Sequence, residues 1–175
     1  MPGYRVRMEA LLARLDRIAG GRHAGYVVPE PGRAHPRTRR AFTVIAWLLV
    51  VELLIGLAAV VVAVSLATGG ADVPFAVWMR SVVVLGMTVT LFYFAWRAAK
   101  GYYWAYSRLR LFSKIFPVVT LVIAAIPGLY PLWMVTEQIV FSLILIGVAD
   151  YLDSDHMRAS FPRPGNQGTI GDVRA

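Results

Sequence analysis

The chain has 175 residues, of which 58% are hydrophobic and only 16% are charged, and its mean hydropathy is +0.60. Because about a quarter of the residues in a soluble domain are charged, this composition excludes a soluble globular protein and predicts an integral membrane protein. The net charge is +8 and there is no cysteine, which excludes disulfides, thiolate nucleophiles and cysteine-based metal sites. Since the basic residues flank apolar runs, we interpret them as topology signals and expect no nucleic-acid partner.

The N-terminal part of the chain is predicted to combine a helix with a linker. Residues 4–18 carry apolar side chains at helical spacing, with arginines beside the apolar face. Such a helix either lies in the membrane interface, or packs on the protein or on a second copy. Residues 22–40 contain three prolines and five arginines, which is typical of a poorly ordered linker. We expect Arg37, Arg39 and Arg40, directly before the first apolar run, to face anionic lipid.

Four apolar runs follow, and each is long enough to cross a bilayer core of ~30 Å at ~1.5 Å per residue. The fold class is therefore predicted to be an all-α integral membrane protein, a four-transmembrane-helix bundle with an N-terminal amphipathic cytoplasmic helix. The expected spans are residues 42–67, 75–96, 109–126 and 132–150. The expected parts are a cytoplasmic segment 1–40, a transmembrane domain 41–151 and a flexible cytoplasmic tail 152–175.

The distribution of basic residues predicts the orientation. Residues 1–40 hold nine arginines and residues 97–114 hold five basic residues without an acid, whereas the two opposite connections hold none. Because positively charged loops stay inside, both termini are predicted to be cytoplasmic. Lys100 and Lys114 are the only lysines, an arginine bias that suggests a bacterial genome, and hence a bacterial cytoplasmic membrane.

Glu52 is the most informative polar residue, because it lies ~13 Å into the first predicted span. An ionisable group at that depth costs roughly 2.5–3.5 kcal/mol, so it should face protein or water. Small residues share its helix face, which favours close approach of another helix; they are Gly56, Ala59, Ala63 and Ala67. Glu52 is either a packing residue, bonded to a neighbouring helix or paired with Lys114, or a proton- or cation-coupling site.

Two further groups of charged residues are candidates. Arg80 and Glu137 lie at the same predicted depth near the outer ends of their helices and could form an intramembrane ion pair. An acidic cluster of Asp150, Asp153 and Asp155 lies where the fourth helix reaches the cytoplasm. It could hold a divalent cation, but matching with the basic residues of the 97–114 stretch is favoured, so no metal is expected.

The remaining motifs argue against catalysis. The sequence has no GxxxxGK[ST], HExxH or GxSxG motif, and its three histidines, His23, His35 and His156, are far apart in sequence. The aromatic residues of 102–106 are interpreted as an interfacial belt. We expect no enzyme activity and no cofactor.

One short segment resembles a known family. The stretch from Trp47 to Gly56 around Glu52 is loosely similar to small multidrug-resistance transporters, which also have four helices and a membrane glutamate in the first. Residues 75–78, Phe-Ala-Val-Trp, are similar to a Tyr-Ala-x-Trp motif that lies in the third helix there and in the second here. This resemblance implies proton-coupled transport through Glu52.

The leading hypothesis is a non-enzymatic accessory or scaffold protein that contacts the lipid bilayer and acts by helix packing with a protein partner or by self-association. The alternative is a small proton-coupled transporter or channel that uses Glu52. Burial of Glu52 in a packed contact favours the first, and a water-accessible cavity around it favours the second.

Overall fold

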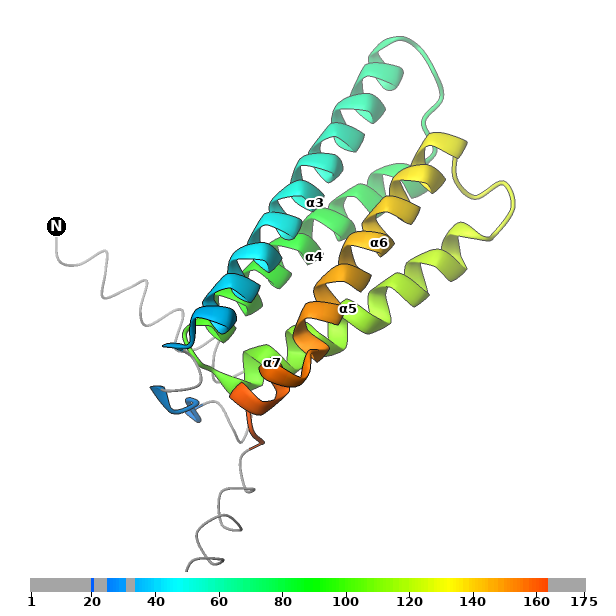
Figure 1. Ribbon diagram of the computed structural model, residues 1–175. Coiled ribbons are helices and arrows are strands. Elements are labelled where there is room, and N and C mark those ends of the chain that lie inside the picture. The colour runs from blue at the N-terminus through cyan, green and yellow to red at the C-terminus, as the bar shows by residue number, and fades with distance from the viewer. Residues whose placement is uncertain (1–19, 21–24, 31–33, 164–175) are drawn as a thin grey trace, which may run out of the picture.

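The structure, a computed structural model, describes residue 20 and residues 25–30 and 34–163 (Figure 1). This part of the chain is all-α and contains five helices: α3 (Pro36–Thr68), α4 (Phe75–Ala99), α5 (Tyr103–Ala124), α6 (Leu132–Asp153) and α7 (Asp155–Ser160). The predicted amphipathic helix 4–18 and residues 164–175 of the predicted tail lie outside the described residues.

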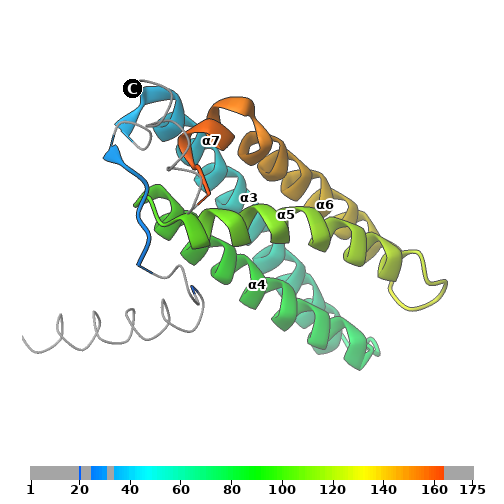
Figure 2. The same ribbon diagram turned by 90° about the horizontal axis from the view of Figure 1, so that it is seen from below.

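The four long helices form a closed bundle. α3 packs against α4 and α6, and α5 packs against the same two helices, so α4 and α6 face each other across the bundle. Figures 1 and 2 show the helices running alongside one another, with α7 and residues 25–30 at the same end of the bundle. Every helix therefore has one face towards the interior and one face towards the surroundings.

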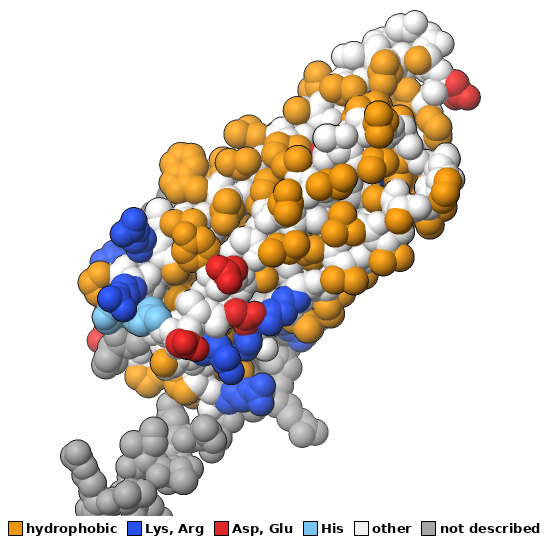
Figure 3. Space-filling model, turned by 45° about the vertical axis from the view of Figure 1, so that its right-hand side comes forward, with side chains coloured by type: hydrophobic (Ala, Val, Ile, Leu, Met, Phe, Trp, Pro, Cys, Tyr) orange, Lys and Arg blue, Asp and Glu red, His pale blue; other side chains and the backbone are white. Residues whose placement is uncertain are grey.

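Three of these helices are long and apolar enough to cross a membrane: α3, α4 and α6. α5 is not among them, because it carries three basic residues before Pro117: Arg108, Arg110 and Lys114. The prediction of helical spans is thus confirmed for three of the four predicted segments, and the chain is a multi-pass membrane protein by length and composition. Its outer surface agrees, with large apolar side chains exposed along the bundle (Figure 3).

α3 begins before the apolar run. Pro36 occupies its first turn, and the ring nitrogen Nδ1 of His35 accepts a hydrogen bond of 3.2 Å from the backbone N–H of Arg37. Proline is favoured at this position because its missing N–H has no partner there anyway. The helix therefore includes residues 36–40, which were predicted to belong to the linker. It ends before Gly70, whose φ of 84° favours glycine.

The aromatic stretch at the start of α5 lies mainly in the core. Trp104 is 4% exposed and Tyr106 is 2% exposed, and the Tyr106 ring stacks on Phe161 with centroids 4.4 Å apart. The interfacial-belt interpretation is therefore wrong for these two residues. Two residues apart in α5, these side chains point to different sides of the helix, and each is covered by a tertiary neighbour: Phe94 of α4 lies against Trp104, and Phe161 against Tyr106.

Short segments close one end of the bundle. The backbone N–H of Val28 donates to the Gly101 carbonyl at 2.9 Å, in an isolated bridge between Val27 and Tyr102. α7 contributes the buried Met157 to the core. α7 lies within the range 152–175 that was expected to be a loose tail, and it packs against α3 and α6.

Candidate functional site: buried polar groups between the helices

Glu52 lies in the packed contact between α3 and α4. Its side chain is 2% exposed, and the Thr88 hydroxyl donates to Glu52 Oε1 at 2.9 Å. The same hydroxyl lies 3.0 Å from the Val84 carbonyl, so its single hydrogen is shared between two acceptors. Glu52 Oε2 is buried and has no hydrogen-bond partner among the described residues. The carboxyl is therefore bound to a neighbouring helix through one oxygen only.

The small-residue stripe beside Glu52 brings α3 close to α4. Gly56, Ala59 and Ala63 are buried, whereas Ala67 at the end of the predicted stripe is exposed. A Cβ atom added at Gly56 would lie 3.2 Å from Cδ2 of Leu85, so glycine permits this approach. The stripe thus serves helix packing over most of its predicted length.

Lys114 does not pair with Glu52. Its ammonium group binds Asp153 of α6, and the Arg110 guanidinium binds the same carboxylate. The side chains of Lys114 and Arg110 reach Asp153 at the end of α6. Their positive charges are therefore neutralised at the end of the bundle and not in its interior. The alternative in which Lys114 pairs with Glu52 is therefore wrong.

Arg80 and Glu137 are brought together inside the bundle. Arg80 Nη1 lies 2.6 Å from Glu137 Oε2, and the two side chains are 7% and 10% exposed. Since α4 and α6 each pack mainly against α3 and α5, this ion pair spans the bundle interior diagonally. The guanidinium also lies 5.8 Å from the centroid of the Tyr130 ring. The arrangement places opposite charges on two helices that share little backbone contact.

A third polar contact, between α5 and α6, was not predicted. Gln138 is 2% exposed, and its side-chain N–H donates to the Thr120 carbonyl. The Thr120 and Ser142 hydroxyls are 3.1 Å apart. Polar residues spaced four apart in the α6 run, Gln138 and Ser142, were the signal in the sequence, since a polar pair at that spacing shares one helix face.

The three carboxylates of the predicted acidic cluster have different surroundings. Asp153 is half-buried between Arg110 and Lys114, while Asp150 and Asp155 are exposed. Across the part of the chain that the structure describes, no group of three or more histidine, aspartate or glutamate side chains could hold a metal ion. Asp153 thus shows the charge matching that the sequence favoured, with residues of α5.

Tyr106 joins the basic end of α5 to α6. Its hydroxyl donates to the Leu152 carbonyl at 2.7 Å. This hydrogen bond links the beginning of α5 to the end of α6.

Two histidines that are distant in sequence meet at the same end. The rings of His35 and His156 have centroids 4.6 Å apart, and His156 Nε2 lies 3.0 Å from the Thr38 hydroxyl. These contacts join the start of α3 to α7. No local pattern indicated them, because α7 reaches α3 only through the tertiary fold.

Arg97 is enclosed by aromatic rings. Its guanidinium carbon lies 4.9 Å from the Tyr102 centroid and 5.1 Å from the Trp96 centroid, and the residue is 7% exposed. Cation–π contact stabilises such an enclosed cation. Arg97 was one of the basic residues expected to match the acidic cluster, and its contact with these rings was not predicted.

The buried polar side chains of Glu52, Arg80 and Gln138 each contact a group on another helix. Comparisons with family models, curated proteins and solved structures give no match. What this geometry can do is specify which helices pack together, because a polar group that loses its partner inside a bilayer is strongly unfavourable.

Proposed function

We propose that this chain is a non-enzymatic accessory or scaffold protein of the bacterial cytoplasmic membrane, acting through helix packing as an assembly partner. The observation that carries the proposal is the burial of Glu52, which is 2% exposed and bonded to Thr88 across the α3–α4 contact. A coupling carboxylate needs water access, whereas a packing carboxylate needs a partner on another helix. Glu52 has the environment of a packing carboxylate, since it is buried and bonded to Thr88 of α4.

The proposal includes α5 as a fourth span. Its second half exposes a continuous apolar surface, with Val118 63% and Val122 64% exposed. Two of its charged residues, Arg110 and Lys114, bind Asp153 at the end of α6. Long basic side chains at helix ends can extend to the interface in this way.

Four spans place both termini on one side, and we assign that side to the cytoplasm. The support is the charge of the two ends, which Figure 3 makes visible: Lys and Arg side chains gather at the end that carries α7. The opposite connections, residues 69–74 and 125–131, hold Asp72 and no basic residue. Positively charged segments remain inside during insertion.

The test is proton flux through the purified, reconstituted chain. In liposomes that contain a pH-sensitive dye, we expect no flux above that of empty liposomes for the parent or for Glu52→Gln. We also expect nearly unchanged stability for Glu52→Gln, since interhelical hydrogen bonds contribute about 0.6 kcal/mol and glutamine can still accept from Thr88. Asp72→Asn, which neutralises an exposed carboxylate at the far end, is the matched control.

The second candidate is a small proton-coupled transporter or channel that uses Glu52. The observation that favours it is Glu52 Oε2, a buried oxygen without a hydrogen-bond partner among the described residues. A parent protein that carries protons, together with a stable Glu52→Gln variant that does not, would establish transport and end the scaffold proposal.

A further inference from the structure

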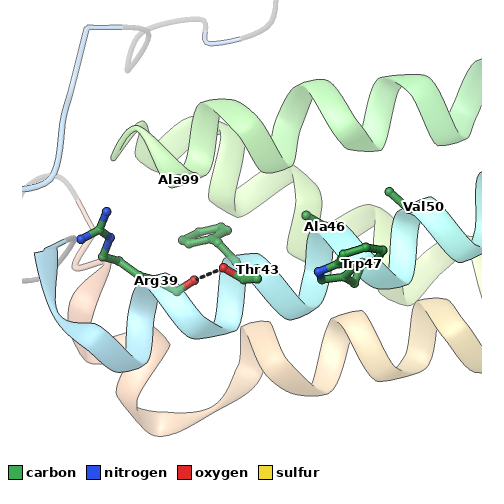
Figure 4. A pocket seen from close by; sticks show the side chains of 7 residues that line it. Arg39, Thr43, Ala46, Trp47, Val50 and Ala99 are labelled. Carbon is green, nitrogen blue, oxygen red and sulfur yellow. Dashed lines mark hydrogen bonds between the residues drawn. The ribbon is translucent and has the colours of Figure 1, made fainter.

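A groove runs along the outer side of α3 at the basic end of the bundle. It has a volume of about 450 Å³ and is lined by Phe42, Thr43, Ala46, Trp47, Val50, Arg39 and Ala99. Figure 4 shows Arg39 at the start of α3, the other α3 residues following it along the helix, and Ala99 on the facing end of α4. A volume of this size lies in the usual range of ligand sites, about 300–1,000 Å³.

The floor of this groove is apolar, and small side chains make it hollow. Ala46 of α3 and Ala99 of α4 leave space between the two helices, and Trp47 forms a wall that is 66% exposed. The helix rises ~16 Å from Arg39 to Val50 at ~1.5 Å per residue. This length is about half of a ~30 Å hydrocarbon core, which is the depth of one lipid leaflet.

The end of the groove at Arg39 and Ala99, here called its upper end, is basic. A second pocket adjoins it at Arg39 and Ala99, and is lined also by Lys100, Tyr102 and Glu30. The Lys100 ammonium lies 3.7 Å from the Trp96 ring centroid, so this cation is held at the same end of α4. Arg39 and Lys100 outweigh the single carboxylate of Glu30, and the charge of this upper end is net positive.

We propose that the groove binds one anionic phospholipid, with its phosphate beside Arg39 and one acyl chain along Ala46, Trp47 and Val50. The charge complementarity and the leaflet-length apolar floor together select this occupant. An arginine forks onto phosphate oxygens with two hydrogen bonds, and basic pockets beside membrane helices bind anionic head groups. The proposal requires only that α3 and α4 span a bilayer, and is independent of the accessory role.

The test is lipid titration of the full chain in detergent, followed by native mass spectrometry. The probes are phosphatidylglycerol and phosphatidylcholine with identical acyl chains. We expect the parent to prefer phosphatidylglycerol, and Arg39→Gln to weaken its binding about fivefold, the effect of one basic residue next to an anionic lipid. Ala46→Phe, which fills the floor, should weaken binding of the same lipid while Arg39 is intact.

Arg37→Gln is the matched control, because Arg37 is an exposed arginine in the same first turn of α3 that does not line the groove. It should leave phosphatidylglycerol binding within twofold of the parent, as roughly expected for a charge outside the site. Equal losses from Arg37→Gln and Arg39→Gln with no effect of Ala46→Phe would show general surface attraction and refute the site. Equal binding of both lipids, or binding that Arg39→Gln leaves unchanged, would refute it as well.

Discussion

The diagonal ion pair offers the sharpest test of how this bundle is stabilised. Changing Arg80 to alanine removes the cation that lies 2.6 Å from Glu137 and leaves a carboxylate that is 10% exposed. Removing one partner of a buried pair costs about 3–5 kcal/mol, because the remaining charge stays buried without compensation. Glu137→Ala should cost a similar amount through the stranded guanidinium. The double variant loses both charges at once and should cost clearly less than the sum.

The measurement is unfolding of the detergent-solubilised protein by sodium dodecyl sulfate, followed by helical circular dichroism. We expect a coupling free energy of about 1.5–3 kcal/mol between Arg80 and Glu137, the upper part of the range for contacting residues. Arg80→Ala combined with Asp150→Ala is the control cycle, since Asp150 is exposed at the other end of α6, and those changes should add. A coupling below about 0.5 kcal/mol for the Arg80–Glu137 cycle would refute the reasoning.

Two other predictions concern topology and helix approach. Single cysteines at Ala71, Ile126 and Asp155, labelled in intact cells with a membrane-impermeant maleimide, should react at the first two positions and not at the third. If α5 does not cross the bilayer, Ile126 will instead be on the side opposite to Ala71. Gly56→Leu should destabilise the protein by about 1–3 kcal/mol, because the larger side chain overfills the α3–α4 contact. Gly86→Leu should be nearly neutral in the same unfolding assay, since an added Cβ there meets nothing within 4 Å, and equal effects of both changes would contradict the close approach.

The positions of the helices could largely be predicted from the sequence because hydropathy is a local property. α3, α4 and α6 each contain the apolar run that marks them as spans. The small residues beside Glu52 indicated that its side chain faces another helix, as it does at Thr88. The ion pair of Arg80 and Glu137 is consistent with their equal predicted depth. These inferences needed only the rise of a helix and the unfavourable energy of a charge in lipid.

The partners of individual polar groups could not be predicted in the same way. Thr88 and Thr90 both bond the carbonyl four residues earlier in α4, but only Thr88 also reaches Glu52. Nothing local distinguishes them, since the choice depends on how α4 is rotated against α3. α7 is a similar case, because its Met157 is buried only when the end of α6 folds back onto α3.

The diagonal ion pair also has a consequence for how the protein is made. Arg80 leaves the ribosome with α4, while Glu137 follows only after α5 and the next turn have been synthesised. At roughly 5–20 residues per second, the arginine waits several seconds for its counter-charge. During that interval Glu52 and Thr88 can already join α3 to α4, but the α3–α4 hairpin carries an uncompensated cation. Until α6 arrives, we expect α4 to stay where Arg80, only five residues after the start of that helix, reaches water or a polar surface. The last span would then complete the integration of the second.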